Sequence, residues 1–357
     1  MFGGEFNILR TIILPEDIST RLVSLTCLLC KDDVWDFLRL PSSTFPVLQR
    51  VEISFIHTLS THQSPFTRDF TRCLDFSIFE DHPALNEATF HIFNCIHPLD
   101  FKLPWGRLTR VDLATAPMPP WIFLNIMNRA SPSLIDGTFH VKFIQVRHRA
   151  LLPRLIETTM PFLKRLRLVL IDPIFDTEFF ALLTMPVLEK MNLEVFRSTA
   201  IGWELWLFVP MLKPTSASLR HLELKNLYLT RRPGVHIPKA RRTSYSELEA
   251  ILDIVPELEV LKLVPDVNVH LPTLEKIASG QLMPKLKILE LFSTSTDVVL
   301  WMVRKRALEV GTSKRPAGGT RSLSQVDLWL RIEEVPEVVR NIRGAGVSEV
   351  VSVRGIA

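Results

Sequence analysis

Cysteine is scarce in this chain and is confined to its first third. Four cysteines occur among 357 residues, at Cys27, Cys30, Cys73 and Cys95. Secreted domains that depend on disulfides carry a denser cysteine framework, so the sequence predicts a reducing compartment. Cys27 and Cys30 have CxxC spacing, but zinc needs four ligands and no second CxxC pair accompanies them. We interpret these two thiols as small core residues, with metal or redox use as the alternative.

The sequence also lacks a long hydrophobic run and a recognisable secretion signal. The longest apolar stretch, residues 201–212, is interrupted by Glu204 and Pro210 and is too short to cross a bilayer. The first residues include Glu5 and Glu16 among apolar side chains and have no basic segment before them, unlike a signal peptide. We therefore expect a soluble intracellular protein, in the cytoplasm, the nucleus or both.

Charge of one sign is not in large excess. The chain has 42 Lys and Arg against 38 Asp and Glu, a net charge of +4, and 47% of its residues are hydrophobic, as in a globular protein. This excess is too small to indicate a nucleic-acid-binding protein. The phosphate-binding motifs GxxxxGK[ST] and GxGxxG are missing, as is the hydrolase motif GxSxG. Since no set of residues supplies a nucleophile, a base and an orienting group, we expect no enzyme and no cofactor.

What the sequence does contain is a repeated phrase of the form LxxLxL. Residues 160–170 (MPFLKRLRLVL) and 185–195 (MPVLEKMNLEV) share a proline, a leucine and the same alternation of apolar residues. The phrase recurs along the chain with a mean spacing of about 31 residues. Its first leucines, the anchor leucines, are Leu9, Leu48, Leu85, Leu108, Leu134, Leu163, Leu188, Leu219, Leu258, Leu286 and Leu323.

The pattern inside each phrase differs from the pattern between phrases. Apolar and polar residues alternate within the phrase, which is typical of a strand with one buried face. Between phrases, four apolar residues from Leu248 to Val255 fall at i, i+3, i+4 and i+7, which indicates a helix. The same helical spacing recurs from Phe179 to Leu183. We interpret the proline before each leucine as the residue that ends the preceding helix.

A strand carrying LxxLxL, followed by a helix at this period, resembles the leucine-rich repeat. The resemblance implies an α/β solenoid of irregular repeats, curved, with parallel strands on its concave face and helices on its convex face. The proline two residues before the leucine, the long units and phrases such as LPWGRLTRVDL are similar to the repeat region of fungal F-box proteins. That resemblance implies a substrate receptor of a ubiquitin ligase, with a Skp-type adaptor and a cullin as partners if an F-box exists. No F-box is evident before the repeats.

The expected organisation is one long repeat region followed by a cap. We predict a solenoid of ten to eleven units over residues 1–330 and a C-terminal cap over residues 331–357. Basic residues cluster near residues 230–243, in a predicted insertion, and over residues 303–321, which contain a predicted mobile loop near residues 309–321. A polyanion-binding protein that uses these basic insertions is one alternative function. A free-standing scaffold or inhibitor of the repeat type is another.

The candidate binding residues are those that the alternation turns away from the core. If the third, fifth and seventh phrase positions face the concavity, a protein partner would meet the side chains there. Acidic residues at the fifth position, such as Glu223 and Asp327, are then interpreted as solvated, as are His91 and His140. Exposed apolar residues among charges favour protein binding, unless the C-terminal segment covers them. The candidates are Arg165, Arg167, Lys190, Asn192, Val260, Lys262, Val264, Ile288, Glu290, Phe292 and Trp329.

Overall fold

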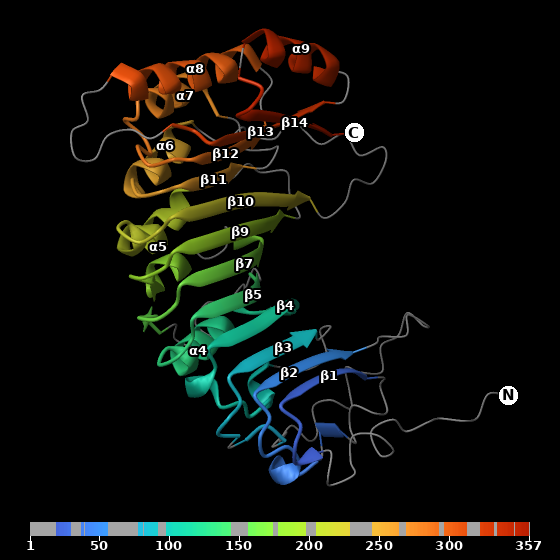
Figure 1. Ribbon diagram of the computed structural model, residues 1–357. Coiled ribbons are helices and arrows are strands. Elements are labelled where there is room, and N and C mark those ends of the chain that lie inside the picture. Colours follow the sequence, from blue (N-terminus) through green and yellow to red (C-terminus); the bar gives the residue numbers. More distant parts are fainter. Residues whose placement is uncertain are drawn as a thin grey trace, which may run out of the picture. The chain divides into compact units, whose positions relative to one another are not determined.

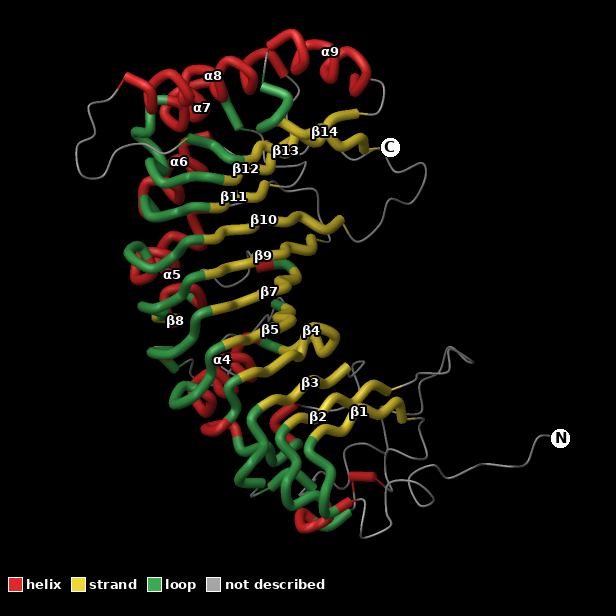
Figure 2. Tube along the Cα trace, viewed as in Figure 1, coloured by secondary structure: helices red, strands yellow, loops and turns green. Residues whose placement is uncertain are grey.

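The structure is a computed structural model of the chain, which divides into two compact units. The units are Met1–Leu163 and Lys164–Ala357, and each is described by itself. Both are α/β, and in both the paired strands are parallel, which confirms the predicted class (Figures 1 and 2). The structure describes residues 19–29, 37–38, 40–55, 78–80, 82–91, 98–143, 156–173, 178–197, 205–228, 245–263, 269–292, 296–312, 322–331, 334–345 and 347–356.

The first unit contains parallel strands that pair in chain order. Strands β1 to β5 are hydrogen-bonded in chain order through four pairings, the last of which has a register shift between Leu113 and Pro117. The helix α4 begins with a proline at its first position, where no backbone N–H is needed. Its buried Phe123 packs edge-on against Phe139 of β5, with 5.1 Å between ring centroids. The elements are β1 (Ser24–Leu29), η2 (Ser42–Thr44), β2 (Arg50–Phe55), β3 (Glu87–His91), η3 (Pro98–Asp100), η4 (Trp105–Arg107), β4 (Arg110–Met118), α4 (Pro120–Ala130), β5 (Asp136–Lys142) and β6 (Thr158–Thr159).

The second unit repeats this plan with more helix. Its parallel strands pair in the order β7, β9, β10, β11, β12, β13 and β14. The remaining elements connect them. The bounds are β7 (Arg165–Ile171), η7 (Phe179–Leu182), β8 (Leu183–Thr184), β9 (Lys190–Arg197), η8 (Leu205–Phe208), α5 (Val209–Leu212), η9 (Lys213–Thr215), β10 (His221–Tyr228), α6 (Tyr245–Ile254), β11 (Val260–Leu263), α7 (Leu271–Ala278), β12 (Ile288–Phe292), α8 (Thr296–Thr312), β13 (Gln325–Arg331), α9 (Val335–Ala345) and β14 (Val351–Ile356).

The anchor leucines form the core of both units, as the phrase predicts. Leu9 lies outside the described residues, and every other anchor is buried, with an exposed fraction of 0% except for 8% at Leu323. The alternation also holds within the strands. In β7, Leu166 and Leu168 are buried while Arg165 and Arg167 are exposed. The repeated leucines thus decide which face of each strand enters the core.

The repeated proline lies in a four-residue turn before β9 and before β12. The N–H of Leu188 donates to the carbonyl of Met185 at 3.2 Å, which makes Pro186 the second residue of a four-residue turn. The same bond occurs at 3.1 Å from Leu286 to Met283. Proline suits the second position because its fixed φ matches the turn. No helix ends at Pro186, because the short strand β8 precedes this turn. The interpretation of the repeated proline as a helix terminator is therefore wrong at Pro186, whereas α6 does end at Ile254, two residues before Pro256.

The predicted helix from Phe179 to Leu183 is also corrected. The chain forms the 3-10 helix η7 there, and Leu183 already belongs to β8. Phe179 and Phe180 are both fully buried, and Phe180 packs against Phe208 at 4.8 Å between ring centroids. A single tight turn places two adjacent rings inside, whereas an amphipathic α-helix buries residues three or four apart. In the described part of this connection there is no α-helix.

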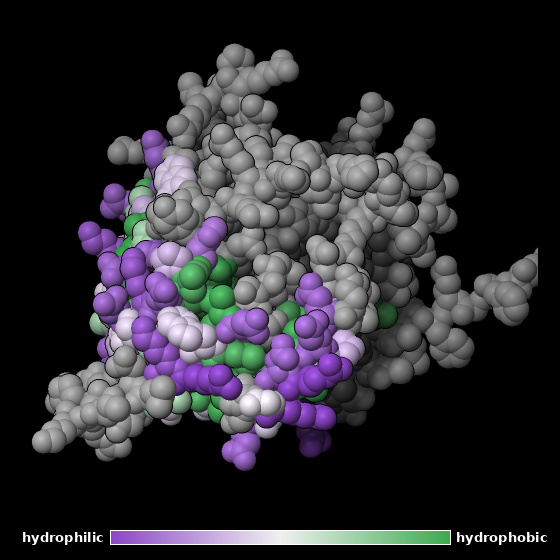
Figure 3. Space-filling model, turned by 90° about the horizontal axis from the view of Figure 1, so that it is seen from above, coloured by the Kyte–Doolittle hydropathy of each residue, from purple (hydrophilic) through white to green (hydrophobic). Residues whose placement is uncertain are grey.

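Residues 331–357 contribute a further helix and strand. Strand β14 pairs in parallel with β13, and α9 packs against β14 and α8. Helix α9 is amphipathic, because Val338 and Ile342 are buried while Glu337 and Arg340 are exposed. Figure 3, which looks down from above Figure 1, shows hydrophilic side chains around smaller hydrophobic areas on the side where α8 and α9 lie. The segment therefore extends the sheet of the second unit by one strand.

A fully buried arginine joins α8 to the connection between α7 and β12. The Arg306 guanidinium has an exposed fraction of 0% and donates to the carbonyl of Ile277, near the end of α7. It also donates to the carbonyls of Met283 at 2.9 Å, Pro284 at 3.2 Å and Leu286 at 3.3 Å. Burial lowers the pKa of Arg306 to about 10, so the side chain stays charged at neutral pH. Carbonyl oxygens take the place of the water that this cation would otherwise require.

Arg306 changes the interpretation of the second basic cluster. It is one of the cations of that cluster, yet its guanidinium lies in the core and is not available to a polyanion. In addition, α8 continues to Thr312, so residues 309–312 of the predicted mobile loop are helical. Residues 313–321 of that loop lie outside the described residues, as do residues 230–243 of the predicted insertion.

The turn before β9 offers a matched test of the anchor leucines. We expect Leu188→Ala to lower the free energy of unfolding by about 2–5 kcal/mol, because it leaves a cavity in a closely packed core. Val187→Ala, one residue earlier, should change it by less than about 0.5 kcal/mol because Val187 is 37% exposed. Urea unfolding followed by circular dichroism measures both. Equal losses would contradict the anchor role of Leu188.

Arg306 provides a second test of the fold. Arg306→Met should lower the free energy of unfolding by about 3 kcal/mol, because several buried carbonyls lose a charged hydrogen-bond donor. The matched control is Arg304→Met, since Arg304 is exposed on the same helix; we expect a change of less than about 0.5 kcal/mol. Chemical unfolding of both variants measures these changes. An Arg306→Met protein as stable as the unmodified protein would show that the buried cation is dispensable.

Candidate protein-binding face

The outward face of the second unit consists of the side chains that alternate with the buried ones on its strands. Strand register places the fifth phrase positions of successive repeats directly opposite one another. The resulting fifth-position row is Arg167, Asn192, Glu223, Lys262, Glu290, Asp327 and Ser352. The third-position row beside it is Arg165, Lys190, His221, Val260, Ile288 and Gln325. The structure thus brings together most of the predicted candidates.

Charges at the fifth and seventh phrase positions of β7, β9 and β10 are matched within the face. Arg167 donates from Nε to Glu194 at 2.9 Å and from Nη2 to the same carboxylate at 3.1 Å. This two-point geometry is the strongest form of an arginine–carboxylate pair, and the Glu194 side chain is only 6% exposed. Lys225 pairs with Glu223 at 2.8 Å. The cations Arg167 and Lys225 are therefore already partly neutralised.

The far end of the face is a hydrogen-bonded cluster around Trp329. Its indole N–H donates to Glu290 at 2.7 Å, and Glu290 also pairs with Lys262 at 3.2 Å. Arg354 of β14 lies over the Trp329 ring, 5.3 Å from its centroid. Trp329 is half-buried as a result. It presents a rigid ring whose polar atom is satisfied, which is the property of an interface anchor.

Asp327 differs from its predicted state. Its interpretation as a solvated carboxylate is wrong, because the residue is 3% exposed. It accepts hydrogen bonds from Gln325 at 2.8 Å, from Ser352, and from Arg354 at 3.4 Å. Two of these donors come from β14, so the C-terminal segment adds side chains to the face and contacts Asp327 directly. The sequence does not indicate these contacts, because Ser352 and Arg354 belong to the strand that follows α9.

The apolar candidates are only partly accessible. Val260 and Ile288 are half-buried in the third-position row. Val264 lies outside the described residues, and so does the side chain of Phe292. The apolar part of the candidate face therefore rests on Val260, Ile288 and Trp329.

The opposite end of the third-position row is cationic. Arg165 lies opposite Lys190, and Lys190 lies opposite His221. Arg165 and Lys190 are exposed, while His221 is half-buried. Burial lowers the pKa of the His221 imidazole, and the neighbouring Lys190 ammonium lowers it further. Sequence reasoning did not select His221, although its third position in the phrase SASLRHLEL was the available signal.

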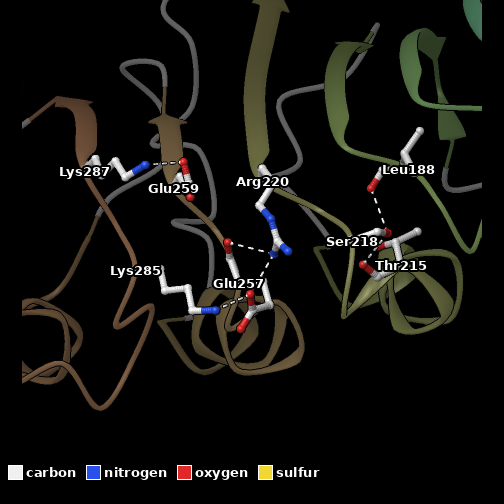
Figure 4. Close-up of polar contacts among 8 residues, drawn as sticks. All are labelled: Leu188, Thr215, Ser218, Arg220, Glu257, Glu259, Lys285 and Lys287. Atoms are coloured by element: carbon white, nitrogen blue, oxygen red, sulfur yellow. Dashed lines mark hydrogen bonds and ion pairs between the residues drawn. The ribbon is translucent and has the colours of Figure 1, made fainter. Parts of the chain in front are cut away.

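A second set of charges follows the edge where the strands begin. At the second phrase position the charge alternates in sign, through Lys164, Glu189, Arg220, Glu259 and Lys287. Lys164 pairs with Glu189 at 3.3 Å and Lys287 with Glu259 at 2.6 Å. Figure 4 shows part of this edge. Opposite charges on adjacent parallel strands favour the observed register.

Glu257, beside this edge, pairs with two cations. It pairs with Arg220 at 2.9 Å and with Lys285 at 2.5 Å, as Figure 4 shows. On the other side of Arg220, the Ser218 hydroxyl donates to the carbonyl of the anchor Leu188 at 2.9 Å. These side chains satisfy one another, so we assign them a structural role.

The first unit has polar groups but no catalytic arrangement among its described residues. Cys27 is half-buried, and burial raises the pKa of its thiol to about 12, which makes it a poor nucleophile at neutral pH. Cys30 lies outside the described residues. His91 lies 3.8 Å from Glu52, and His140 contacts the carbonyl of Ala114 at 3.1 Å. The Nε2 atom of His140 is buried, so its interpretation as a solvated residue is wrong, whereas the His91 side chain is 33% exposed.

Comparisons with other proteins do not identify the chain. No model of a known protein family matches it, and no curated protein matches it. Across the described ranges, no group of three or more His, Cys, Asp or Glu side chains could hold a metal ion. None of the helices in the described part is long and apolar enough to cross a membrane. The resemblance to leucine-rich repeats therefore remains a prediction.

The Glu257 network predicts a pH dependence of stability. Hydrogen bonding to Lys285 and the nearby Arg220 charge lower the pKa of Glu257 below its ordinary 4.5. The folded state then binds fewer protons than the unfolded state, so this stabilisation is complete above about pH 4.5 and is lost as the pH falls below it. We expect Glu257→Gln to lower the free energy of unfolding by about 0.5 kcal/mol near pH 7 and to have little effect near pH 3.

The matched control for this experiment is Glu275→Gln, on an exposed residue of α7. It should show no comparable difference between the two pH values when unfolding is measured in urea. A Glu257→Gln effect that is independent of pH would contradict the ionic origin of the stabilisation.

Proposed function

We propose that this chain is a non-enzymatic protein-interaction module of the leucine-rich-repeat type, and that its partner binds the outward face of the second unit. The observation that carries the proposal is the strand register. It aligns one outward side chain from each of seven successive described strands into the fifth-position row. Neighbouring side chains such as Arg167, Asn192 and Glu223 differ in charge and size. The row is therefore suited to binding an extended protein surface selectively.

The chemistry of the face also favours a protein partner. Trp329, Val260 and Ile288 supply partly buried apolar area, and charged residues surround them. Such a mixture is typical of interfaces in which an aromatic anchor contributes most of the binding energy. A catalytic site would need a nucleophile and a base in hydrogen-bonding contact, and we find no such pair on the described face.

The resemblance to fungal F-box proteins refines the proposal. We infer from it that the module holds the substrate of a ubiquitin ligase and works with a Skp-type adaptor and a cullin. A free-standing scaffold or inhibitor would use the same face without ligase subunits. Recovery of an adaptor and a cullin with the tagged protein, identified by mass spectrometry, supports the receptor, whereas a stable partner without them supports the scaffold.

A pair of tryptophans tests the location of the binding face. Trp329 belongs to the face and Trp301 to α8, and each has a cation beside its ring, Arg354 and Lys305 respectively. With the identified partner purified, we expect Trp329→Ala to weaken binding about 30-fold, because it removes the central anchor. Trp301→Ala should change it less than about twofold.

Isothermal titration calorimetry gives both affinities, and circular dichroism verifies that each variant folds. Equal effects of the two substitutions, or an effect of Trp301→Ala alone, would move the binding site away from the outward face.

A further inference from the structure

We propose that the first unit contains a binding pocket for a phosphate monoester with an apolar body. The pocket lies among the end of α4, the 3-10 helices η3 and η4, and the chain at Glu80, and its volume is about 830 Å³. Pockets for small ligands typically measure roughly 300–1,000 Å³. The charged residues that line it are Glu80, Lys102, Arg107 and Arg129. The inference goes beyond the proposed function, which concerns a face of the second unit.

The packing of η4 against the end of α4 brings both arginines to the pocket. A Cβ atom built on Gly106 would lie 3.6 Å from the carbonyl oxygen of Arg129, so the backbones of these two elements are in contact. Arg107 follows Gly106 directly, and both arginines line the pocket. The turn at η4 is fixed, because Trp105 is buried and the N–H of Arg107 donates to the carbonyl of Pro104 at 2.8 Å. The backbone that carries the two cations is therefore formed before a ligand binds.

Two of the four charges in the pocket balance each other, and the other two do not. The Lys102 ammonium lies 3.1 Å from the Glu80 carboxylate. Arg107 and Arg129 are exposed, and no carboxylate of the described residues lies at ion-pair distance from either guanidinium. Three cations and one carboxylate leave a net charge of +2 on the described lining. An anionic ligand would therefore meet two cations that it need not take from another partner.

This charge matches a phosphate monoester better than a carboxylate. A phosphate monoester carries about −1.5 to −2 charges near pH 7 and has three acceptor oxygens, so two guanidinium groups can both donate to it. A single carboxylate would leave one positive charge unbalanced, and so would each phosphate of a nucleic-acid backbone, which carries one charge.

The rest of the lining indicates what the phosphate is attached to. Apolar side chains complete the pocket, among them Leu99, Leu103 and Pro104. Apolar walls with a few convergent polar groups are typical of small-ligand sites, in which the polar groups fix the orientation of the ligand. We therefore expect the phosphate to contact the arginines while an apolar group, such as an aromatic ring, lies against these walls.

The test uses the full chain and phenyl phosphate, with isothermal titration calorimetry at low ionic strength as the readout. We expect Arg107→Gln and Arg129→Gln each to weaken binding about tenfold, because each removes a charged hydrogen-bond donor. The matched control is Arg110→Gln. It makes the same change in net charge on an exposed residue of the same unit, outside the pocket lining, and should weaken binding less than about twofold.

Glu80 provides a change of the opposite sign. Glu80→Gln removes the ion-pair partner of Lys102, so the lysine can contact the phosphate and binding should tighten about threefold. Glu87→Gln is the control, because Glu87 pairs with Arg50 at 3.4 Å outside the pocket lining; it should leave the affinity nearly unchanged. Binding to the unmodified protein should weaken between about pH 7.5 and pH 5, because the ligand loses its second negative charge near about pH 6.

Three results would overturn the inference. The first is the absence of binding at millimolar phenyl phosphate, and the second is an equal effect of Arg107→Gln and Arg110→Gln, which would indicate general electrostatic attraction. The third is benzoate that binds as tightly as phenyl phosphate. Circular dichroism verifies that each variant folds.

A phosphotyrosyl peptide distinguishes two sources of the same phosphate chemistry. Tighter binding of the peptide than of phenyl phosphate supports the pocket with a phosphorylated protein segment as its ligand. Weaker binding of the peptide supports the pocket with a free phosphate ester as its ligand.

Discussion

The burial of one anchor leucine in each repeat is the constraint on which the rest of this structure depends. Leu163, Leu188 and Leu219 are all fully buried just before their strands begin, and they fix where each strand starts. Because side chains alternate along a strand, that starting point decides which residues face outward. A shift of one residue in β7 would turn Arg165 and Arg167 into the core. The composition of the proposed binding face therefore follows from core packing.

Register then converts a sequence repeat into a surface. Residues such as Arg167, Asn192 and Glu223 are separated by 25 to 31 positions in the chain, yet they lie opposite one another across three strands. The core side of these strands is nearly uniform, since each repeat needs the same leucines. The outward side is free of that requirement and carries Arg, Asn, Glu and Lys in turn. Along each strand, positions that repeat the same apolar residues therefore alternate with positions whose residues vary from repeat to repeat.

The phrase predicts the strands, their buried face and the outward candidates, because all three depend on local alternation. The connections are less predictable. The spacing of Phe179 and Leu182 suits an α-helix and a 3-10 turn equally well, and only the short path to β8 selects the turn. Pro186 likewise follows a strand here, so its role depends on what precedes it. Local pattern does not contain that information.

The candidate site, too, has features that the sequence predicts and features that it does not. Sequence places Asp327 on the outward face, but its burial arises from Ser352 and Arg354, which β14 brings alongside it. The two-point pair between Arg167 and Glu194 joins a fifth position to a seventh position on the next strand. Such contacts depend on how two neighbouring strands are aligned. The sequence of a single repeat does not define that alignment. For this reason the residues of the face were predictable, while their pairing was not.

Pairing within the face also limits what a partner can recognise. Breaking the Arg167–Glu194 pair would expose two charges that now satisfy each other, and a partner would have to replace both hydrogen bonds to gain from either. Lys190, at the same end of the face, is exposed. At the other end, Trp329 is already held by Glu290 and Arg354, so it meets a partner as a preordered surface. A partner that binds the proposed face should therefore find its rigid aromatic contact at Trp329.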